Sequence, residues 1–179
     1  MAAAEALSAA RRTFLRGERV EMQALADELQ ISRVTLHRWV GNRDLLLGEV
    51  IWSLAEPTLR AARAATRATG AAGIAEVAGR YLQAAYEAPW MRAYLEREGE
   101  IALRVLTTDR SVMQRRSVEA TRALLAAEVD AGRLAPAMDL ADLAYIIVRI
   151  GESFLYTDVI TGGEPAPEKA RQAILALLS

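Results

Sequence analysis

The chain contains no cysteine and a single histidine, His37, in 179 residues. The lack of thiols excludes disulfides, cysteine nucleophiles and thiolate metal sites, and one imidazole cannot build a multi-histidine metal centre. No G-x-S-x-G elbow, P-loop or G-x-G-x-x-G sequence occurs. Glu96, Glu98 and Glu100 are spaced by two on an expected helix, so we expect a solvated face rather than a catalytic carboxylate set. We therefore predict that the protein is not an enzyme and uses no metal or cofactor.

Prolines are few and long apolar runs are missing. The chain has five prolines, and 53% of its residues are hydrophobic, mainly Ala and Leu, which favours helices. No uncharged stretch approaches the roughly 20 apolar residues of a membrane-spanning helix. The N-terminal sequence MAAAEALSAARR carries an acid within its alanines and arginines after them, unlike a signal peptide. We expect an all-α protein of the cytoplasm, with no membrane partner.

A basic segment stands out in this chain, whose formal net charge is −1. From Ser32 to Arg43 there are three arginines and no acidic residue. The hydroxyl of Ser32 can cap a helix that starts after it, and apolar spacing in residues 21–29 predicts another short helix before it. Two short helices, the second with a basic outer face, indicate a helix-turn-helix that reads the major groove of DNA.

The segment resembles the DNA-binding motif of the TetR family of bacterial regulators, S-x-x-T-[LV]-Y-x-[FH]-[FV]-x-[SN]-K-x-x-L. The resemblance covers residues 5–52, and the residues in the same register are Ser32, Thr35, Leu36, His37, Trp39, Val40, Asn42, Arg43 and Leu46. His37 replaces the usual tyrosine and Arg43 the usual lysine, and both keep a hydrogen-bond donor. Gln30 replaces a common turn glycine, at a mild cost in backbone strain.

The resemblance implies a DNA-contacting role for several residues. They are Arg33, Val34, Thr35, His37, Arg38, Trp39 and Arg43. Arg33 and Arg38 are expected at base edges, where each can donate two hydrogen bonds to guanine. His37 and Arg43 are expected to contact phosphates, which set the register of binding without reading the sequence. Trp39 is expected beneath the helix, with its indole N–H near a phosphate. The alternative for each arginine is a solvated surface charge.

Apolar spacing and breaks at glycine and proline predict about nine helices. The expected helices cover residues 2–16, 21–29, 32–39, 43–67, 74–87, 89–107, 110–131, 139–160 and 167–178. Asn42, Asp109 and Asp139 are expected N-caps, and Gly70 and Gly73 are expected in a loop. We predict a three-helix helix-turn-helix domain over residues 1–48. The helix that starts at residue 43 would join it to a helical effector-binding and dimerisation domain over 49–179.

The helix at 139–160 is apolar on most of its circumference, which predicts burial on several sides. We expect it to form a four-helix interface in a homodimer together with the last helix, through Ala173, Ile174, Leu177 and Leu178, with Gly151 allowing close approach. A dimer is also what a short recognition helix needs, because two such helices about one DNA turn apart read a palindrome.

One stripe of the same helix is the candidate effector site. It consists of Tyr145, Arg149, Glu152 and Tyr156 at i, i+4, i+7 and i+11. Arg149 would orient a polar head group in an apolar pocket; the alternative is a structural ion pair between Arg149 and Glu152. The expected pocket wall consists of Trp90, Met91, Tyr94, Leu95, Met113 and Phe154. For these residues the alternative is ordinary helical core.

The segment RIGESFLYTDVITG also resembles a TetR subgroup tied to the degradation of quorum-signal lactones, which implies a lactone or fatty-acyl effector. We expect a homodimeric repressor that leaves double-stranded operator DNA when a small, largely apolar effector binds. Repression is expected because it is the commoner mode in the family. The alternative is a helical ligand-carrier or protein-interaction module without specific DNA binding.

Overall fold

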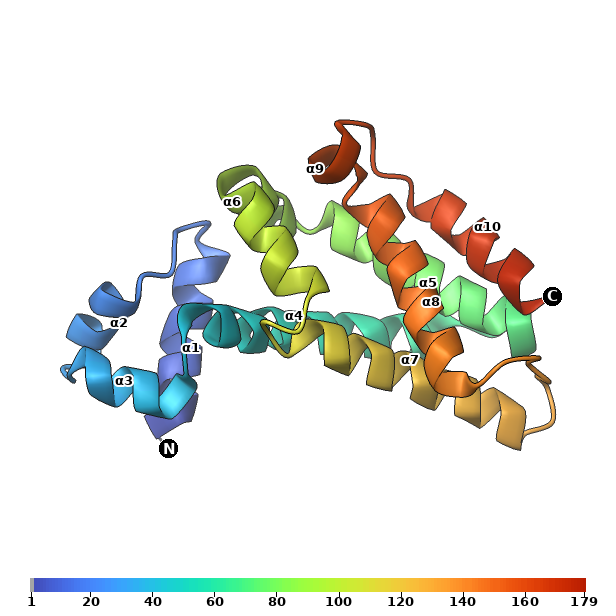
Figure 1. The fold of residues 1–179 in the computed structure, drawn as a ribbon, viewed down its shortest axis with the longest axis horizontal. Coiled ribbons are helices and arrows are strands. Elements are labelled where there is room, and N and C mark those ends of the chain that lie inside the picture. The colour runs from blue at the N-terminus through green and yellow to red at the C-terminus, as the bar shows by residue number, and fades with distance from the viewer. Residues whose placement is uncertain (1) are drawn as a thin grey trace. The chain divides into compact units, whose positions relative to one another are not determined.

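The computed structural model describes residues 2–179, which form ten α-helices and no strand (Figure 1). The helices are α1 (Ala2–Leu15), α2 (Met22–Glu28), α3 (Arg33–Val40), α4 (Arg43–Ala65), α5 (Gly70–Glu87), α6 (Pro89–Thr107), α7 (Met113–Asp130), α8 (Leu140–Leu155), α9 (Thr157–Thr161) and α10 (Pro167–Leu178). Within this range no helix is both long and apolar enough to span a bilayer. The predicted all-α fold is confirmed.

Three of the expected helix boundaries are wrong, and one of them is the start of α5, at Gly70 rather than at residue 74. The helix expected over 139–160 divides into α8 and α9, because Tyr156 leaves the helical conformation (φ −106°, ψ 24°). The helix expected from residue 110, with Asp109 as its cap, begins at Met113 instead, so the cap expected at Asp109 is wrong. The backbone N–H of Met113 donates to the buried hydroxyl of Ser111 at 3.2 Å. The expected caps at Asn42 and Asp139 are confirmed, since each side chain accepts a backbone N–H of its helix.

Gly70 and Gly73 lie in the first turn of α5 and not in a loop, so that expectation is also wrong. Both are buried, and both are glycines because other backbone lies against them. A Cβ atom at Gly70 would lie 2.7 Å from the carbonyl oxygen of Arg133, and one at Gly73 would lie 2.5 Å from that of Ala68. The sequence pattern could not distinguish close packing from a turn as the reason for these glycines.

The chain forms two compact units. The first comprises the residues up to Leu54 together with Pro89–Gln114, and the second comprises Ala55–Ala88 and Arg115–Ser179. The first unit thus contains α6 in addition to the helix-turn-helix segment. The two units share α4, which passes from one to the other near its middle.

The core of the first unit follows the helical spacing of small and large apolar residues. Ala6, Ala10 and Phe14 recur every four residues along one face of α1, and all three are at most 1% exposed. Leu36 of α3 and Leu47 of α4 are completely buried as well. Full burial of such a leucine or phenylalanine contributes about 1.5–3 kcal/mol. This core holds the short α3, which an isolated peptide of its length would not form stably in water.

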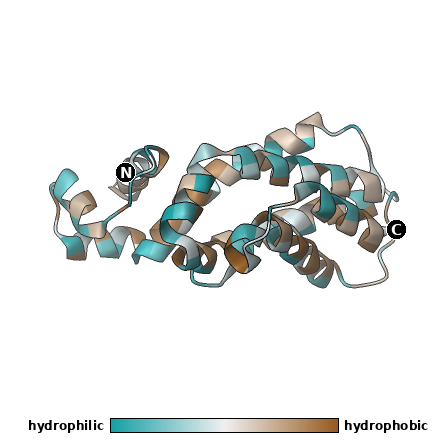
Figure 2. Cartoon of the chain, turned by 90° about the horizontal axis from the view of Figure 1, so that it is seen from above, coloured by the Kyte–Doolittle hydropathy of each residue, from teal (hydrophilic) through white to brown (hydrophobic). Residues whose placement is uncertain are grey.

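The core of the second unit lies among α5, α7, α8 and α10, where apolar residues alternate with polar ones along the helices (Figure 2). Its buried residues are Ile74, Ala75, Leu125, Leu143, Ala144, Ile147 and Ile174. Two residues expected at the dimer interface pack within this chain instead. Ile174 is fully buried in the core, and Gly151 lies against Leu82 of α5, 3.3 Å from the position of its missing Cβ. The sequence showed that these helices were apolar but not which element covers them.

A carboxylate of α7 caps the start of α5 in the second unit. The backbone N–H of Gly70 donates to Glu128 Oε2 at 2.6 Å, while Arg133 donates to both carboxylate oxygens at 2.8 and 2.9 Å. The hydrogen bonds from Arg133 and Gly70 lower the pKa of Glu128 to about 2. The ionised carboxylate therefore stabilises the fold.

Replacing Glu128 with Gln is expected to destabilise the second unit by about 1.5–3 kcal/mol at pH 7, as for hydrogen bonds to a charged group. Because the folded pKa lies below the ordinary value, the stabilisation is complete above about pH 4.5 and is lost as the pH falls toward 2. Urea unfolding followed by circular dichroism should show a smaller difference between Glu128→Gln and wild type at pH 3 than at pH 7. Glu119→Gln, on an exposed position of the same helix, is the control. A difference that is as large at pH 3 would contradict this role.

Candidate nucleic-acid interface

The turn between α2 and α3 has the geometry of a helix-turn-helix. Gln30 takes a positive φ of 56°, as expected for a residue in the place of a turn glycine. Ser32 then caps α3: its hydroxyl accepts from the backbone N–H of Thr35 at 3.1 Å and lies 2.9 Å from the Thr35 hydroxyl. The cap expected from the sequence is confirmed, and it determines where α3 begins.

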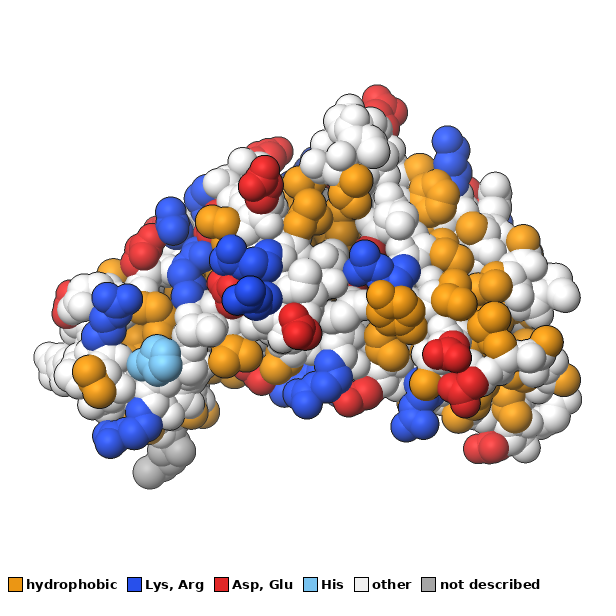
Figure 3. Space-filling view, viewed as in Figure 1, with side chains coloured by type: hydrophobic (Ala, Val, Ile, Leu, Met, Phe, Trp, Pro, Cys, Tyr) orange, Lys and Arg blue, Asp and Glu red, His pale blue; other side chains and the backbone are white. Residues whose placement is uncertain are grey.

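The outward face of α3 carries no acid. Arg33, Val34, His37 and Arg38 are exposed, and Val34 keeps 76% of its surface accessible. On the face of the molecule shown in Figure 3, basic side chains lie on either side of the histidine. Leu36, on the opposite side of the helix, is completely buried. The helix is therefore anchored from beneath while its basic residues are accessible.

The other two residues of α3 that were predicted to contact DNA, Thr35 and Trp39, are less exposed. Thr35 is half-buried and its hydroxyl lies at the Ser32 cap. Trp39 is half-buried and lines an open groove of about 450 Å³, together with residues of α1 and α4 that include Leu7 and Leu45. Trp39 thus lies on the side of α3 that borders this groove, at the edge of the unit's apolar core, rather than on the most exposed face of the helix.

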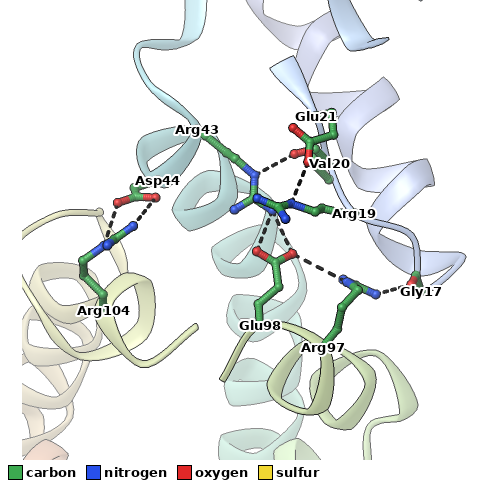
Figure 4. A network of polar contacts seen from close by, with 9 residues as sticks. All are labelled: Gly17, Arg19, Val20, Glu21, Arg43, Asp44, Arg97, Glu98 and Arg104. Carbon is green, nitrogen blue, oxygen red and sulfur yellow. Dashed lines mark hydrogen bonds and ion pairs between the residues drawn. The ribbon is translucent and has the colours of Figure 1, made fainter. Parts of the chain in front are cut away.

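Arg43, at the start of α4, is bound within the first unit (Figure 4). Its Nε donates to the carbonyl oxygen of Val20 at 2.7 Å, and its Nη2 donates to Glu98 Oε1 at 2.8 Å and lies 2.7 Å from Oε2. The side chains of Arg43 and Glu98 are 16% and 2% exposed. The expectation that Glu98 lies on a solvated face is wrong. Three acids spaced by two point in different directions, and Glu98 is the one that points inward.

Further polar contacts connect α6 to the rest of the first unit. Arg104 donates to Asp44 of α4 at 3.1 Å, and Arg97 donates to the carbonyl oxygen of Gly17 after α1 (Figure 4). Gly99 interrupts α6 with a non-helical backbone (φ 32°, ψ −102°) directly after Glu98. The contacts before and after this break hold the two segments of α6 against the segment that follows α1 and against the start of α4.

Five of the six residues predicted to form the pocket wall belong to this first unit: Trp90, Met91, Tyr94, Leu95 and Met113. The ring of Phe14 in α1 packs against the rings of Trp90 and Tyr94, with centroids 5.8 and 5.1 Å apart. Tyr94 is fully buried, and burial raises the pKa of its hydroxyl. Met113 is also buried, at 4% exposed. The aromatic pair helps to hold α6 on α1, in agreement with the alternative that these residues are core.

The remaining predicted effector residues lie on α8 and just after it, in the second unit. Tyr145 is 51% exposed, whereas Tyr156 is buried. Arg149 donates to Glu152 at 2.7 Å, which is the ion pair expected as the structural alternative. Burial raises the pKa of Glu152 to about 7, and the charge of Arg149 opposes this rise. The four residues thus do not share one environment, although they share a helical stripe.

Sequence reasoning missed Glu98 and Tyr81. Glu98 follows Tyr94 by one turn and precedes Ala102 by another, so its place on the apolar face of α6 was a usable signal. Tyr81 of α5 has a pKa raised to about 12 by burial and, secondarily, by the charge of Glu152. Nothing in its local sequence connects Tyr81 with α8.

Comparison with known proteins identifies the family. Residues 69–179 match the family model described as "Tetracyclin repressor-like, C-terminal domain". The structure of the R. erythropolis transcriptional repressor QsdR, from the TetR family, is 30% identical, with a TM-score of 0.92 over 98% of this chain and 93% of that one. The TetR family regulator PfmR from Thermus thermophilus is 22% identical over 97% and 96% of the two chains, with a TM-score of 0.45. A search of curated proteins gave no match. From the family match over most of the chain and the likeness to a whole TetR repressor, we conclude that this protein belongs to the TetR family of transcriptional regulators.

Proposed function

We propose that the protein is a transcriptional repressor of the cytoplasm that binds a palindromic operator as a homodimer and leaves it when a small, largely apolar effector binds. The observation that carries the proposal is the capped, acid-free and exposed face of α3 in a chain of this family. Repression is supported by the QsdR structure, whose protein is described as a transcriptional repressor.

On operator DNA, α3 lies in the major groove. Arg33 and Arg38 donate to guanine edges, and Val34 offers an apolar contact for a thymine methyl group. Thr35 and His37 bind near the sugar-phosphate backbone, and Trp39 supports the helix from its side. Because α3 has only eight residues, one copy reads few base pairs. A dimer therefore supplies the second half-site.

Exposed apolar side chains on the second unit support the dimer. Tyr145 of α8 and Leu177 of α10 are 51% and 37% exposed in the single chain. Such side chains on adjacent helices are what a partner's identical helices would cover in a two-fold interface. The predicted domain limits, 1–48 for DNA binding and 49–179 for effector binding and dimerisation, remain part of this proposal.

The effector's polar group is held at Arg149 and Glu152, and its class is a lactone or fatty-acyl compound. The guanidinium of Arg149 supplies hydrogen-bond donors and the carboxyl group of Glu152 supplies an acceptor for the polar group of the effector. The effector releases the operator only to the extent that it binds the DNA-free state more tightly than the DNA-bound state.

The test is selection of duplexes from a random 30-base-pair library by the purified full-length protein. Selected duplexes are then compared with scrambled ones across a salt series. A palindromic consensus, a preference of about 10³-fold or more and a steep salt dependence are expected. A well-folded protein that enriches no sequence would overturn the proposal and favour the carrier alternative.

Arg149→Met is expected to reduce release of the selected operator by N-acyl lactones or fatty acids, while operator affinity without effector stays within about two-fold. The reason is that Arg149 is on α8 and not on the DNA-binding helices. Fluorescence anisotropy of labelled operator, titrated with effector, measures both quantities. Arg122→Ala removes the same charge from an exposed position on α7 and should change neither. An unaltered effector response in Arg149→Met would mean that Arg149 is purely structural.

A further inference from the structure

We propose that Glu98 holds Arg43 in the DNA-free protein and competes with an operator phosphate for it. This inference rests on the proposed function, because it needs a DNA complex in which Arg43 contacts the backbone. Beyond that function, it assigns to Glu98 of α6 an influence on operator affinity that acts through Arg43. Glu98 is then a residue that positions Arg43, not one that touches DNA.

The hold on Arg43 is made by two acceptors on one edge of its guanidinium group. Val20 O accepts from Nε, and the carboxylate of Glu98 accepts from Nη2, at 2.7 and 2.8 Å (Figure 4). A planar guanidinium bound along one edge is fixed in direction. In this conformation Nε and Nη2 of Arg43 are bound to acceptors of the protein, so a phosphate that binds through these atoms must displace Val20 O and Glu98.

The place of Arg43 in the chain makes a phosphate a real competitor. Arg43 is the first residue of α4, three residues after the last residue of the recognition helix. Asn42 caps the same helix end, where the free backbone N–H groups and the helix dipole favour an anion. The side chain of Arg43 is 16% exposed, so one part of it already reaches the surface.

Release of Arg43 leaves Glu98 with another cation nearby. Glu98 is only 2% exposed, and a buried carboxylate without a partner is costly. Nε of Arg97 lies 3.6 Å from Glu98 Oε1. Arg97 can therefore compensate part of the charge of Glu98 when Arg43 turns to DNA. Arg43 then exchanges one anionic partner, Glu98, for another, the phosphate, and Glu98 keeps a cation nearby.

The first measurement is the affinity for the selected operator across a salt series, for wild type and three variants. Arg43→Met should weaken binding and flatten the plot of log affinity against log salt concentration by about one unit per subunit, because a phosphate contact is lost. Glu98→Gln should strengthen binding by about 3- to 10-fold with the slope unchanged, because more of the free protein is ready to bind. Combining both changes should give the affinity of Arg43→Met alone.

Two controls separate this mechanism from simpler effects. Glu96→Gln removes the same negative charge from an exposed position on α6 and should leave affinity within about two-fold. Urea unfolding followed by tryptophan fluorescence checks the first unit, which contains all three tryptophans, Trp39, Trp52 and Trp90. Glu98→Leu, a second variant without a polar group, should also strengthen binding if it folds.

The outcomes are distinct. No specific binding by wild type would overturn the proposed function and this inference together. Specific binding by wild type with an unchanged salt slope in Arg43→Met would overturn the inference alone, since Arg43 would then stay with Glu98 on DNA. Weaker binding by a folded Glu98→Gln, or a gain that persists without Arg43, would also overturn it.

Discussion

Arg38→Ala is expected to lower affinity for the selected operator by about 30-fold or more. A bidentate contact to guanine is worth about 1–3 kcal/mol, and a dimer makes it once in each half-site. On a scrambled duplex the same variant loses only a general electrostatic contribution, so its affinity should fall by about two- to five-fold. The structure supports this separation because Arg38 is exposed on α3 and the helix is anchored through Leu36 on its other side.

The measurement is direct titration of both duplexes at one fixed salt concentration, with Arg122→Ala as the variant of equal charge. Repeating the selection with Arg38→Ala should relax the consensus at one symmetric pair of positions and leave the others intact. Equal losses on the operator and on the scrambled duplex would rule out base reading by Arg38 and reduce it to a phosphate contact or a surface charge.

Gly70→Ala is expected to destabilise the second unit by about 2–5 kcal/mol. Gly70 has a φ of 61°, which costs an alanine about 1–2 kcal/mol. The added Cβ would also lie 2.7 Å from the carbonyl oxygen of Arg133. That atom belongs to the backbone of the turn that follows α7 and can move away only if this turn shifts, so overpacking adds about 1–3 kcal/mol.

Gly132→Ala is the matched control, because Gly132 has a φ of 68° and no atom lies within 4 Å of its missing Cβ. It should cost only the backbone part, about 1–2 kcal/mol. Urea unfolding followed by circular dichroism gives both values. Tryptophan fluorescence, which reports on the first unit alone, should change less than circular dichroism does in Gly70→Ala. If the two variants were equally stable, the close approach of the added Cβ to the carbonyl oxygen of Arg133 would not contribute to the free energy of unfolding.

The position of α6 bears on how an effector could act. Trp90 and Tyr94, which the sequence suggested as pocket walls, pack against Phe14 of α1. Glu98 of the same helix binds Arg43 at the start of α4. A ligand that altered α6 would therefore act on α1 and on the start of α4 through direct contacts. The Gly99 break is the point where the backbone of α6 departs from the helical conformation. This connection is the physical basis of our proposal for Glu98.

The helix-turn-helix could be predicted from the sequence because its determinants are local. The Ser32 cap joins residues three apart, and the burial of Leu36 follows from helical spacing. The absence of acids between Ser32 and Arg43 is visible without any structure. The all-α class, the caps at Asn42 and Asp139 and most helix boundaries are local in the same sense, since hydrogen bonds within a few residues decide them.

Only the tertiary structure determined which residues the apolar and charged side chains contact when the partners are far apart in the sequence. Arg43 and Glu98 are 55 residues apart, and Gly70 and Glu128 are 58 apart, so no local pattern pairs them. Spacing showed that α8 is apolar nearly all round, but not that Gly151 faces α5 of its own chain. Periodicity identifies a buried face and its size. Which element covers that face depends on how the whole chain packs, because burial is favourable against any complementary surface.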